Sequence, residues 1–291
     1  MRLRRLIRES HFDAYVVECR FHEEPVWSME ADRWPELILP TAGGFLLRHD
    51  GVVAACCPGR LTLVPPGLTY EVGHLPHLPD TTLVIRLRGE SWLSAWGAAC
   101  LDVPVHRLLP LPVAFGMMLL AQTLMAEVAG AKTALLGRIS AIIDLVMEGA
   151  GHSRLGSGMP GRIERGIRAV LTGRAGANVP SLAMTAAASE AHFAREFRRL
   201  HGMTPGAFLG AQRLLRSWAL MRKGSSMTEA ARLTGFSHVA HLSNTVRRIA
   251  GLPRTRLAKA LAEAPWSTCD RLLNRGVDAC RRQGPPAFPV Y

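Results

Sequence analysis

The C-terminal half of this 291-residue chain repeats its own pattern at a spacing of 48 to 49 residues. Ala183 lies six residues before Ser189, and Ala231 lies six residues before Ser237. A serine can cap the N-terminus of a helix, and a small alanine lets a second helix cross close behind the first. Each copy is therefore expected to fold as a helix, a tight turn and a second helix. Two such copies constrain this half of the chain to be helical.

The repeat continues through the second helix of each copy, where the spacing becomes 49. Apolar, basic and glycine positions recur in the same order: Phe193, Phe197, Arg198, Arg199 and Gly202 correspond to Leu242, Val246, Arg247, Arg248 and Gly251. Glycine is the residue expected just beyond a helix end. Between the copies, Thr204 and Pro205 predict the start of a long helix that ends near Arg222. A capping box from Ser226 to Glu229 begins the second copy.

Positive charge is concentrated in the same half of the chain. Residues 1–150 contain 13 basic and 16 acidic side chains, whereas residues 151–291 contain 22 basic and seven acidic ones. The segment 162–259 alone has a net charge of +13, against +12 for the whole chain. Drift of the composition toward arginine does not by itself explain this segregation. A polyanion is the partner that such a segment attracts, and the slightly acidic N-terminal half is expected to stay off it.

The N-terminal half alternates short apolar runs with turn residues, as an antiparallel β unit does. The runs expected to be strands lie between residues 15 and 87 and read YVVEC, ELIL, GFLLRH, GVVAACC, LTLV, TYEVGH and TTLVIRL. Asp50 and Gly51 predict a tight hairpin between two of them, because both residue types tolerate a positive φ. So many short strands predict a small barrel or sandwich.

A helical apolar period follows the predicted strands. It runs from about residue 112 to 148 and is split near Gly130, which predicts two antiparallel helices. Residues 149–161 contain five glycines, two serines and a proline, a composition typical of a flexible linker. The predicted domain organisation is therefore a β unit with a helix pair in 1–148, a linker in 149–161, the helical repeat in 162–262 and a C-terminal extension in 263–291.

Segments for export or membrane insertion are not recognised in the sequence. The basic N-terminus lacks the apolar core and cleavage site of a signal peptide, and the most apolar stretch, 108–126, is interrupted by prolines. We expect a cytoplasmic protein without a membrane partner. The six cysteines show no CxxC pair and no Cys/His spacing suited to zinc, so reduced thiols are expected. His74 and His77 near Glu71 are the nearest approach to a metal cluster, but an apparent loop around them favours packing, and we predict no metal site and no cofactor.

The helical repeat resembles the two-helix-turn-helix DNA-binding domain of AraC/XylS-type transcription regulators over about residues 163–261. The motifs that carry the resemblance occur in order: Leu182-Ala183, Ser189, Phe193, Phe197 and Gly202, then Thr204-Pro205, Phe208, Arg213-Leu214 and Leu220-Met221, then Ala231, Gly235-Phe236, Leu242 and Gly251. Residues 1–148 are less closely similar to the cupin-like effector-binding and dimerisation region of many such regulators. The resemblance implies an α+β fold, with an N-terminal cupin-like β-barrel and helix pair and a C-terminal all-α domain of two helix-turn-helix units.

The resemblance also implies which side chains meet DNA, because the second helix of each unit would lie in the major groove. Arg195 would bond to guanine, Asn244 to adenine, and His241 to a base or a phosphate, with His192 exposed beside the groove. Small apolar side chains would contact thymine methyls or other apolar groups: Ala191, Ala194, Val239 and Ala240. A single surface arginine is more often only solvated, but the repeated pairs favour phosphate contact by Arg198, Arg199, Arg247 and Arg248.

The function predicted is that of a sequence-specific DNA-binding transcription regulator, not an enzyme, controlled by a small effector in the N-terminal domain. Double-stranded DNA is the expected partner. The resemblance is also compatible with RNA polymerase and a second copy of the chain as partners. Two alternatives are a cupin-type enzyme with an accessory nucleic-acid-binding domain and a non-specific nucleic-acid binder. Four aromatic residues could line a barrel cavity, although core packing is their simpler role, and effector-binding residues stay unassigned: Trp27, Trp34, Phe45 and Tyr70.

Overall fold

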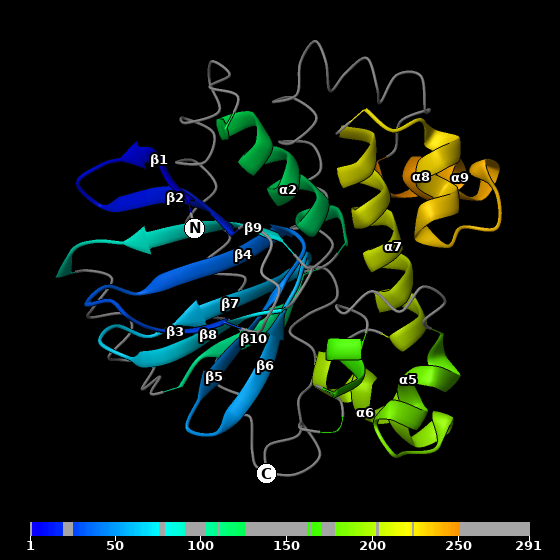
Figure 1. The fold of residues 1–291 in the computed structure, drawn as a ribbon, viewed down its shortest axis with the longest axis horizontal. Coiled ribbons are helices and arrows are strands. Elements are labelled where there is room, and N and C mark those ends of the chain that lie inside the picture. Colours follow the sequence, from blue (N-terminus) through cyan, green and yellow to red (C-terminus); the bar gives the residue numbers. More distant parts are fainter. Residues whose placement is uncertain are drawn as a thin grey trace.

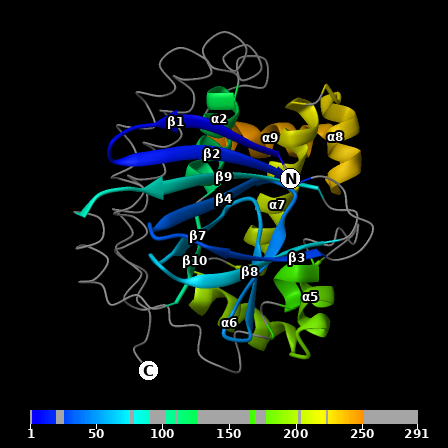
Figure 2. The same cartoon turned by 60° about the vertical axis from the view of Figure 1, so that its left-hand side comes forward.

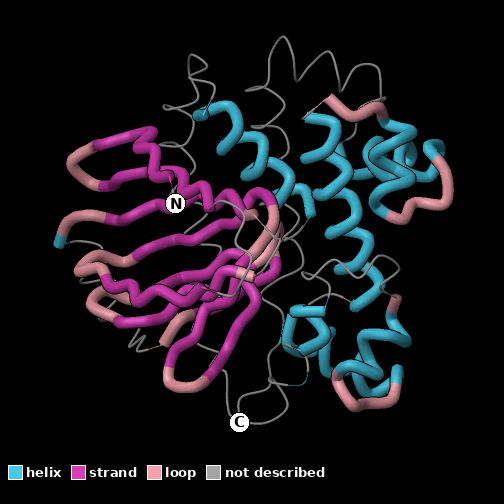
Figure 3. The backbone as a smooth tube through the Cα atoms, viewed as in Figure 1, coloured by secondary structure: helices cyan, strands magenta, loops and turns pink. Residues whose placement is uncertain are grey.

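The computed structural model describes residues 2–19, 26–75, 79–90, 103–109, 111–125, 162, 165–169, 178–201, 204–222 and 224–250. Predictions for the linker 149–161, the second helix of the pair, residues 251–262 and the extension 263–291 lie outside these residues. A strand-rich N-terminal domain lies beside a helical C-terminal domain, and helix α7 runs along the boundary between them (Figure 1). Figure 3 shows this division of strands and helices along the backbone. No helix in the described part of the chain is long and apolar enough to cross a bilayer.

The strands form two antiparallel sheets. The six-stranded sheet has the spatial order β1 (Arg2–Arg8), β2 (Phe12–Cys19), β9 (Asp80–Leu87), β4 (Glu36–Ala42), β7 (Arg60–Val64) and β10 (Val105–Leu108). The four-stranded sheet has the order β3 (Val26–Ala31), β8 (Thr69–His74), β5 (Phe45–His49) and β6 (Val52–Cys56). Buried side chains of both sheets meet in one core, so the two sheets face each other as a small barrel.

The seven predicted strands are confirmed, and three further strands were not predicted. Strand β1 reads RLRRLIR and pairs only with β2, at the edge of the large sheet. Charged side chains are typical of edge strands because they discourage pairing with another chain. Strand β3 alternates between exposed and half-buried residues, and β10 is only four residues long. None of these three has the apolar run by which a strand is recognised in sequence.

Alternation along the large sheet separates two cores. On β4, Ile38 faces the small sheet, whereas Leu37 and Leu39 face the helices. The helix face is covered by α2 (Leu111–Met125), the first helix of the predicted pair, and by α7. The C-terminal domain is thus packed directly on the sheet, where burying one leucine side chain contributes roughly 1.5 to 3 kcal/mol.

The predicted hairpin between β5 and β6 is confirmed. Asp50 and Gly51 have φ of 47° and 75°, and His49 pairs with Val52 across the turn. Positive φ at both central residues gives the turn the twist of the strands that it joins.

Five helices of the C-terminal domain are described: α5 (Val179–Thr185), α6 (Glu190–His201), α7 (Pro205–Arg222), α8 (Met227–Thr234) and α9 (Val239–Ala250). The predicted bounds of α7 are confirmed. Thr204 caps α7 and Ser226 caps α8, since their hydroxyls accept from Ala207 N and Glu229 N at 3.2 Å each. The helix pairs α5–α6 and α8–α9 lie at opposite ends of α7 (Figures 1 and 2).

The repeat is visible in the turn of each helix-turn-helix unit. Ala188 N donates to Ala183 O at 3.0 Å, and 48 residues later Phe236 N donates to Ala231 O at 3.0 Å. The left-handed position of the turn, φ 52° in the first unit and 79° in the second, falls on Ala187 and Gly235. The same backbone turn therefore directs α6 and α9.

The N-terminal caps of α6 and α9 differ. Ser189 caps α6 as predicted, since its hydroxyl accepts from His192 N at 3.3 Å. The predicted cap by Ser237 is wrong, because α9 begins one residue later than the 48-residue spacing implies. His238 takes the capping role, with its Nδ1 accepting from His241 N at 3.1 Å.

Both helix-turn-helix units pack against the barrel domain. Leu46 and Cys57 share a core with the buried phenylalanines of the first unit. On α7, Gln212 Nε2 donates to Pro58 O at 2.6 Å. Trp218 of α7 belongs to the core that α2 and the large sheet share with the second unit. The turn between β6 and β7 is thus in direct contact with the helix that joins the two units.

Candidate nucleic-acid interface and barrel cavity

Helix α6 presents a polar face to solvent because its aromatic residues are buried. The Phe193 and Phe197 rings lie 5.6 Å apart, and Phe208 of α7 lies 5.5 Å from Phe197. Of the predicted DNA-contacting residues on this helix, Ala191, Arg195 and Arg198 are exposed, and His192, Ala194 and Arg199 are half-buried. The structure therefore brings the predicted contact residues of the first unit onto one accessible face.

The two arginines of the first pair differ in their surroundings. Arg199 Nη2 lies 2.8 Å from Glu196 Oε2, one turn earlier on the same helix. Arg198 is exposed. A phosphate contact by Arg199 would compete with this carboxylate, so Arg198 is the better candidate of the two.

Helix α9 repeats this arrangement with smaller buried side chains. Leu242 and Val246 are buried. Of the predicted contact residues, Ala240, His241, Asn244 and Arg247 are exposed and Val239 is half-buried; the side chain of Arg248 lies outside the described residues. The predicted interface of the second unit is accessible too.

Two polar side chains on α9 already have partners. Arg247 Nη2 donates to Asn244 Oδ1 at 3.2 Å. The Asn244 oxygen has two lone pairs, so it can accept from Arg247 and from adenine N6–H together, while the amide nitrogen donates to adenine N7. The His241 ring packs edge-on against Phe236 at 5.2 Å, and its Nδ1 lies 3.3 Å from Ser237 Oγ, so Nε2 is the ring nitrogen available for a further contact.

A cavity of about 160 Å³ lies between the two sheets. A cavity of similar volume in another protein holds one benzene molecule. Apolar side chains from both sheets contribute to the lining: Val17, Ile38, Phe45, Val72 and Val84. The space therefore suits a small, partly apolar molecule.

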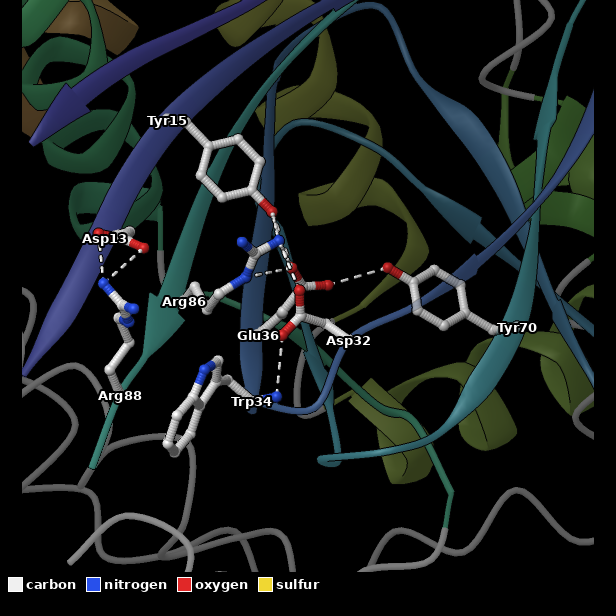
Figure 4. Close-up of polar contacts among 8 residues, drawn as sticks. All are labelled: Asp13, Tyr15, Asp32, Trp34, Glu36, Tyr70, Arg86 and Arg88. Atoms are coloured by element: carbon white, nitrogen blue, oxygen red, sulfur yellow. Dashed lines mark hydrogen bonds and ion pairs between the residues drawn. The ribbon is translucent and has the colours of Figure 1, made fainter. Parts of the chain in front are cut away.

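One end of the cavity holds a buried carboxylate with three donors (Figure 4). Glu36 accepts from Tyr15 Oη at 2.7 Å, from Tyr70 Oη at 3.0 Å and from Arg86 Nη2 at 3.0 Å. Arg86 Nη2 also pairs with Asp32 Oδ2 at 2.8 Å. Burial, and then the charge of Glu36, raise the pKa of both tyrosines far above the ordinary value, so their hydroxyls stay protonated donors.

The other end of the cavity holds a chain of three ionisable side chains. Cys19 Sγ lies 3.5 Å from His74 Nε2, and His74 Nδ1 lies 3.0 Å from Asp80 Oδ2. The hydrogen bond to Asp80, followed by that to Cys19, raises the pKa of His74 from 6.5 to about 10. At neutral pH His74 is therefore an imidazolium between the sulfur of Cys19 and the carboxylate of Asp80.

The same three residues are the one described group whose ligand atoms, all within 4.8 Å of one another, could hold a metal ion. However, both Asp80 oxygens are already acceptors, Oδ2 from His74 and Oδ1 from Thr82 at 3.2 Å. Protein zinc sites need at least three ligand side chains. The arrangement fits a hydrogen-bonded triad better than an open ligand set.

The structure corrects the interpretation of His74. This residue is not in a loop: β8 continues to it, and it pairs with Phe45 of β5 and Val26 of β3. Glu71 points away from the cavity and pairs with Arg48. The predicted neighbourhood of His74 and Glu71 is therefore wrong, because residues an odd number apart on a strand lie on opposite faces. His77 lies outside the described residues.

The aromatic residues proposed for the cavity divide into two groups. Phe45 and Tyr70 line it. Trp27 instead packs on Gly73, under the guanidinium of Arg48 at 4.3 Å. Trp34 lies beneath Arg33 at 5.0 Å. Two of the four aromatic residues therefore line the cavity, and the two tryptophans do not.

Sequence reasoning missed the polar residues that distinguish this cavity. Tyr15, Glu36 and Arg86 lie in or beside strands that were predicted, at positions that alternate with apolar ones. A polar residue at a core-facing position of a predicted strand was the available signal. A polar residue within a strand does not by itself reveal that Tyr15 and Arg86 meet at the carboxylate of Glu36.

Comparison with protein-family models identifies the class of the helical domain. Residues 182–260 match the model described as a helix-turn-helix domain. The resemblance of this segment to AraC/XylS-type DNA-binding domains is thereby confirmed. The segment contains α6 and α9 with all the described residues that are predicted to contact DNA, so these helices belong to a DNA-binding domain. No protein of curated function matches the sequence.

Solved structures with similar arrangements include ToxT and the DNA-binding domain of AdpA, a transcriptional factor. ToxT from Vibrio cholerae, solved with an unsaturated fatty acid bound, is 10% identical, with 86% of this chain and 96% of its own covered and a TM-score of 0.36. The DNA-binding domain of AdpA, solved with a target DNA, is 29% identical, with 36% and 96% covered and a TM-score of 0.33.

The barrel domain has its own neighbours among solved structures. The cupin domain of an XRE family transcriptional regulator from Enterobacter cloacae is 11% identical, with 30% of this chain and 96% of its own covered and a TM-score of 0.27. All of these TM-scores are low, and the strands and helices of this chain themselves define its two domains.

Proposed function

We propose that the protein is a sequence-specific DNA-binding transcription regulator whose barrel cavity binds a small effector. The observation that supports this best is the placement of two equivalent helices, α6 and α9, at opposite ends of α7. Helix α7 has 18 residues and is therefore about 27 Å long. One turn of B-DNA is about 34 Å, so two helices at this separation suit successive major grooves on one side of the duplex.

The exposed side chains suggest different roles for the two units. Arg195 on α6 can bond bidentately to guanine, which supports base discrimination by the first unit. On α9, Ala240 and Val239 offer only apolar contact, and Arg247 already occupies one of the two lone pairs of the Asn244 oxygen. We therefore expect the first unit to specify more of the target sequence, while Arg198 and Arg247 contact phosphates.

The cavity limits the chemistry of the effector. ToxT was solved with an unsaturated fatty acid, a long anionic ligand. In this chain the cavity lining includes the carboxylates of Glu30, Asp32, Glu36 and Asp80 against the cations Arg86 and His74. This balance and the volume of about 160 Å³ favour a small neutral or cationic effector over a fatty acid.

The turn between β6 and β7 follows Cys56, which pairs with the cavity-lining Phe45, and the turn itself contacts α7. Gln212 of α7 binds Pro58 O, and Leu215 packs against Gly59 of the same turn. We propose that an effector acts by shifting this contact, because α7 carries both units. RNA polymerase and a second copy of the chain are further partners in this proposal, and the cytoplasm is the compartment in which it would operate.

Selection of bound sequences from a random duplex library, followed by footprinting with the full-length protein, tests the proposal. The expected result is one conserved motif with two half-sites about one helical turn apart, protected in the presence of competitor DNA. Uniform enrichment without a motif would overturn sequence-specific regulation and indicate a non-specific nucleic-acid binder.

A further inference from the structure

The Cys19 end of the cavity has a geometry that DNA binding does not require. Nε2 of His74 faces the sulfur at 3.5 Å, and Nδ1 faces Asp80 at 3.0 Å. Thr82 Oγ1 donates to the other oxygen of Asp80 at 3.2 Å and so fixes the carboxylate. A thiol, an imidazole and an orienting carboxylate in this order are the arrangement of an activated cysteine nucleophile.

The fold holds the three residues in place through sheet register. Cys19 on β2 pairs directly with Asp80 on β9, while His74 reaches them from the opposing sheet. Cys19 and Asp80 are buried, at 5% and 3% exposure. All three residues line the cavity, so a molecule bound in the cavity can contact the sulfur of Cys19 directly.

We propose that Cys19 is a thiolate nucleophile that captures a small α,β-unsaturated carbonyl compound inside the barrel. In this step the sulfur forms a bond to the β-carbon, and the π electrons of the C=C bond move to give an enolate. The Nε2 proton of the His74 imidazolium is transferred to the enolate, which leaves a neutral imidazole beside a thioether. No oxidant or further reactant is needed.

The cavity supports this class of ligand in two ways. Its volume of about 160 Å³ suits a compound of benzene size. An unsaturated aldehyde or ketone is neutral, and so is not repelled by the excess of carboxylates in the lining. The reaction is stoichiometric capture, independent of whether the helical domain binds a particular DNA sequence.

Some of the charged groups around the cavity favour a negative charge on the Cys19 sulfur, and others disfavour it. The ionisable side chains that line it, apart from the triad, are Tyr15, Glu30, Asp32, Glu36, Tyr70 and Arg86. The carboxylates disfavour a second negative charge, and the imidazolium of His74, in contact with the sulfur, favours it. The balance between them is what the pH dependence of alkylation measures.

The test is the alkylation rate of each cysteine in the full-length protein by N-ethylmaleimide, an α,β-unsaturated imide, followed by peptide mass mapping. An ordinary thiol with a pKa of about 8.5 reacts about seventy-fold more slowly at pH 6 than at pH 8, because its thiolate fraction falls by that factor. For Cys19 we expect a change of less than about three-fold. Cys56, which is buried beside Thr62, is the internal control.

Two variants separate a reactive triad from a merely accessible cysteine. In His74→Gln the pH dependence of Cys19 should become as steep as that of an ordinary thiol, and Asp80→Asn should give an intermediate slope. If either variant fails to fold, the wild-type profile still decides the matter. A steep profile or no labelling of Cys19 in the wild-type protein would overturn the proposal.

A bound metal ion would produce a different pattern. Incubation with EDTA before alkylation, with metal content measured in parallel, should leave the Cys19 rate unchanged. If EDTA released a stoichiometric metal ion and only then exposed Cys19 to N-ethylmaleimide, the three residues would be a metal site and the nucleophile proposal would be wrong.

Discussion

The turn of the first helix-turn-helix unit contains an alanine where the second unit has glycine, and this difference predicts opposite effects of two substitutions. Ala187 has φ 52° and Gly235 has φ 79°, at equivalent positions of the repeat. A side chain in the left-handed region costs roughly 1 to 2 kcal/mol, whereas glycine carries no such penalty. Glycine also makes the unfolded chain more flexible, which lowers the stability of the folded protein by about 0.4 to 1 kcal/mol and so offsets part of this gain.

Ala187→Gly should therefore stabilise the folded protein by about 0.5 to 1 kcal/mol, as the difference between these two opposing effects. Gly235→Ala should destabilise it by a similar amount. The surroundings do not add to this cost, because a Cβ on Gly235 would meet Arg213 Nε at 3.6 Å, an ordinary contact. The two substitutions therefore isolate the backbone effect.

The assay is thermal unfolding of both full-length variants and the wild type, monitored by circular dichroism of the helices. The midpoints should move in opposite directions. For a domain of this size a change of 1 kcal/mol corresponds to roughly 4 to 8 °C in thermal midpoint. A loss of stability in Ala187→Gly would refute the assignment of strain to this turn, as would a gain in Gly235→Ala.

Three further predictions concern the interface and the cavity. Arg195→Ala should relax discrimination at one base pair by about 1 to 3 kcal/mol, measured by titrating a panel of site variants; an unchanged preference pattern would exclude base contact. Arg198→Ala should weaken binding to all sequences and lower the slope of log K against log salt by about one, and a changed base preference would contradict the phosphate role. Because the pKa of His74 is raised to about 10, its protonated form stabilises the fold fully below pH 6.5, and this contribution is lost as the pH rises through 10. The stability difference between wild type and His74→Gln should shrink over that interval in unfolding titrations, and a difference that grows with pH would contradict the pairing.

Local sequence signals predicted those parts of the fold whose physics is local. The bounds of α7 follow from Thr204 and Pro205 at its start, and the β5–β6 hairpin follows from Asp50 and Gly51. Caps and positive-φ turns depend on a residue and its nearest neighbours, so they can be predicted without knowledge of the rest of the chain.

Elements that depend on neighbours were not predicted. Strand β1 is rich in arginine and is a strand only because β2 pairs with it along one edge. The cap of α9 moved from Ser237 to His238 because the spacing of the repeat changes before the helix begins, and residue type alone does not locate that change. In both cases several positions are locally acceptable and packing selects one.

The sequence by itself determined that the chain has a helical domain with two equivalent units and which face of each second helix is polar, because these depend on spacings within about 50 residues. Only the tertiary structure decided what the barrel contains. Cys19, His74 and Asp80 come from three strands of two sheets, as do the donors that converge on Glu36. Sheet register and the packing of one sheet against the other bring such residues within hydrogen-bonding distance, and neither is encoded in any single segment.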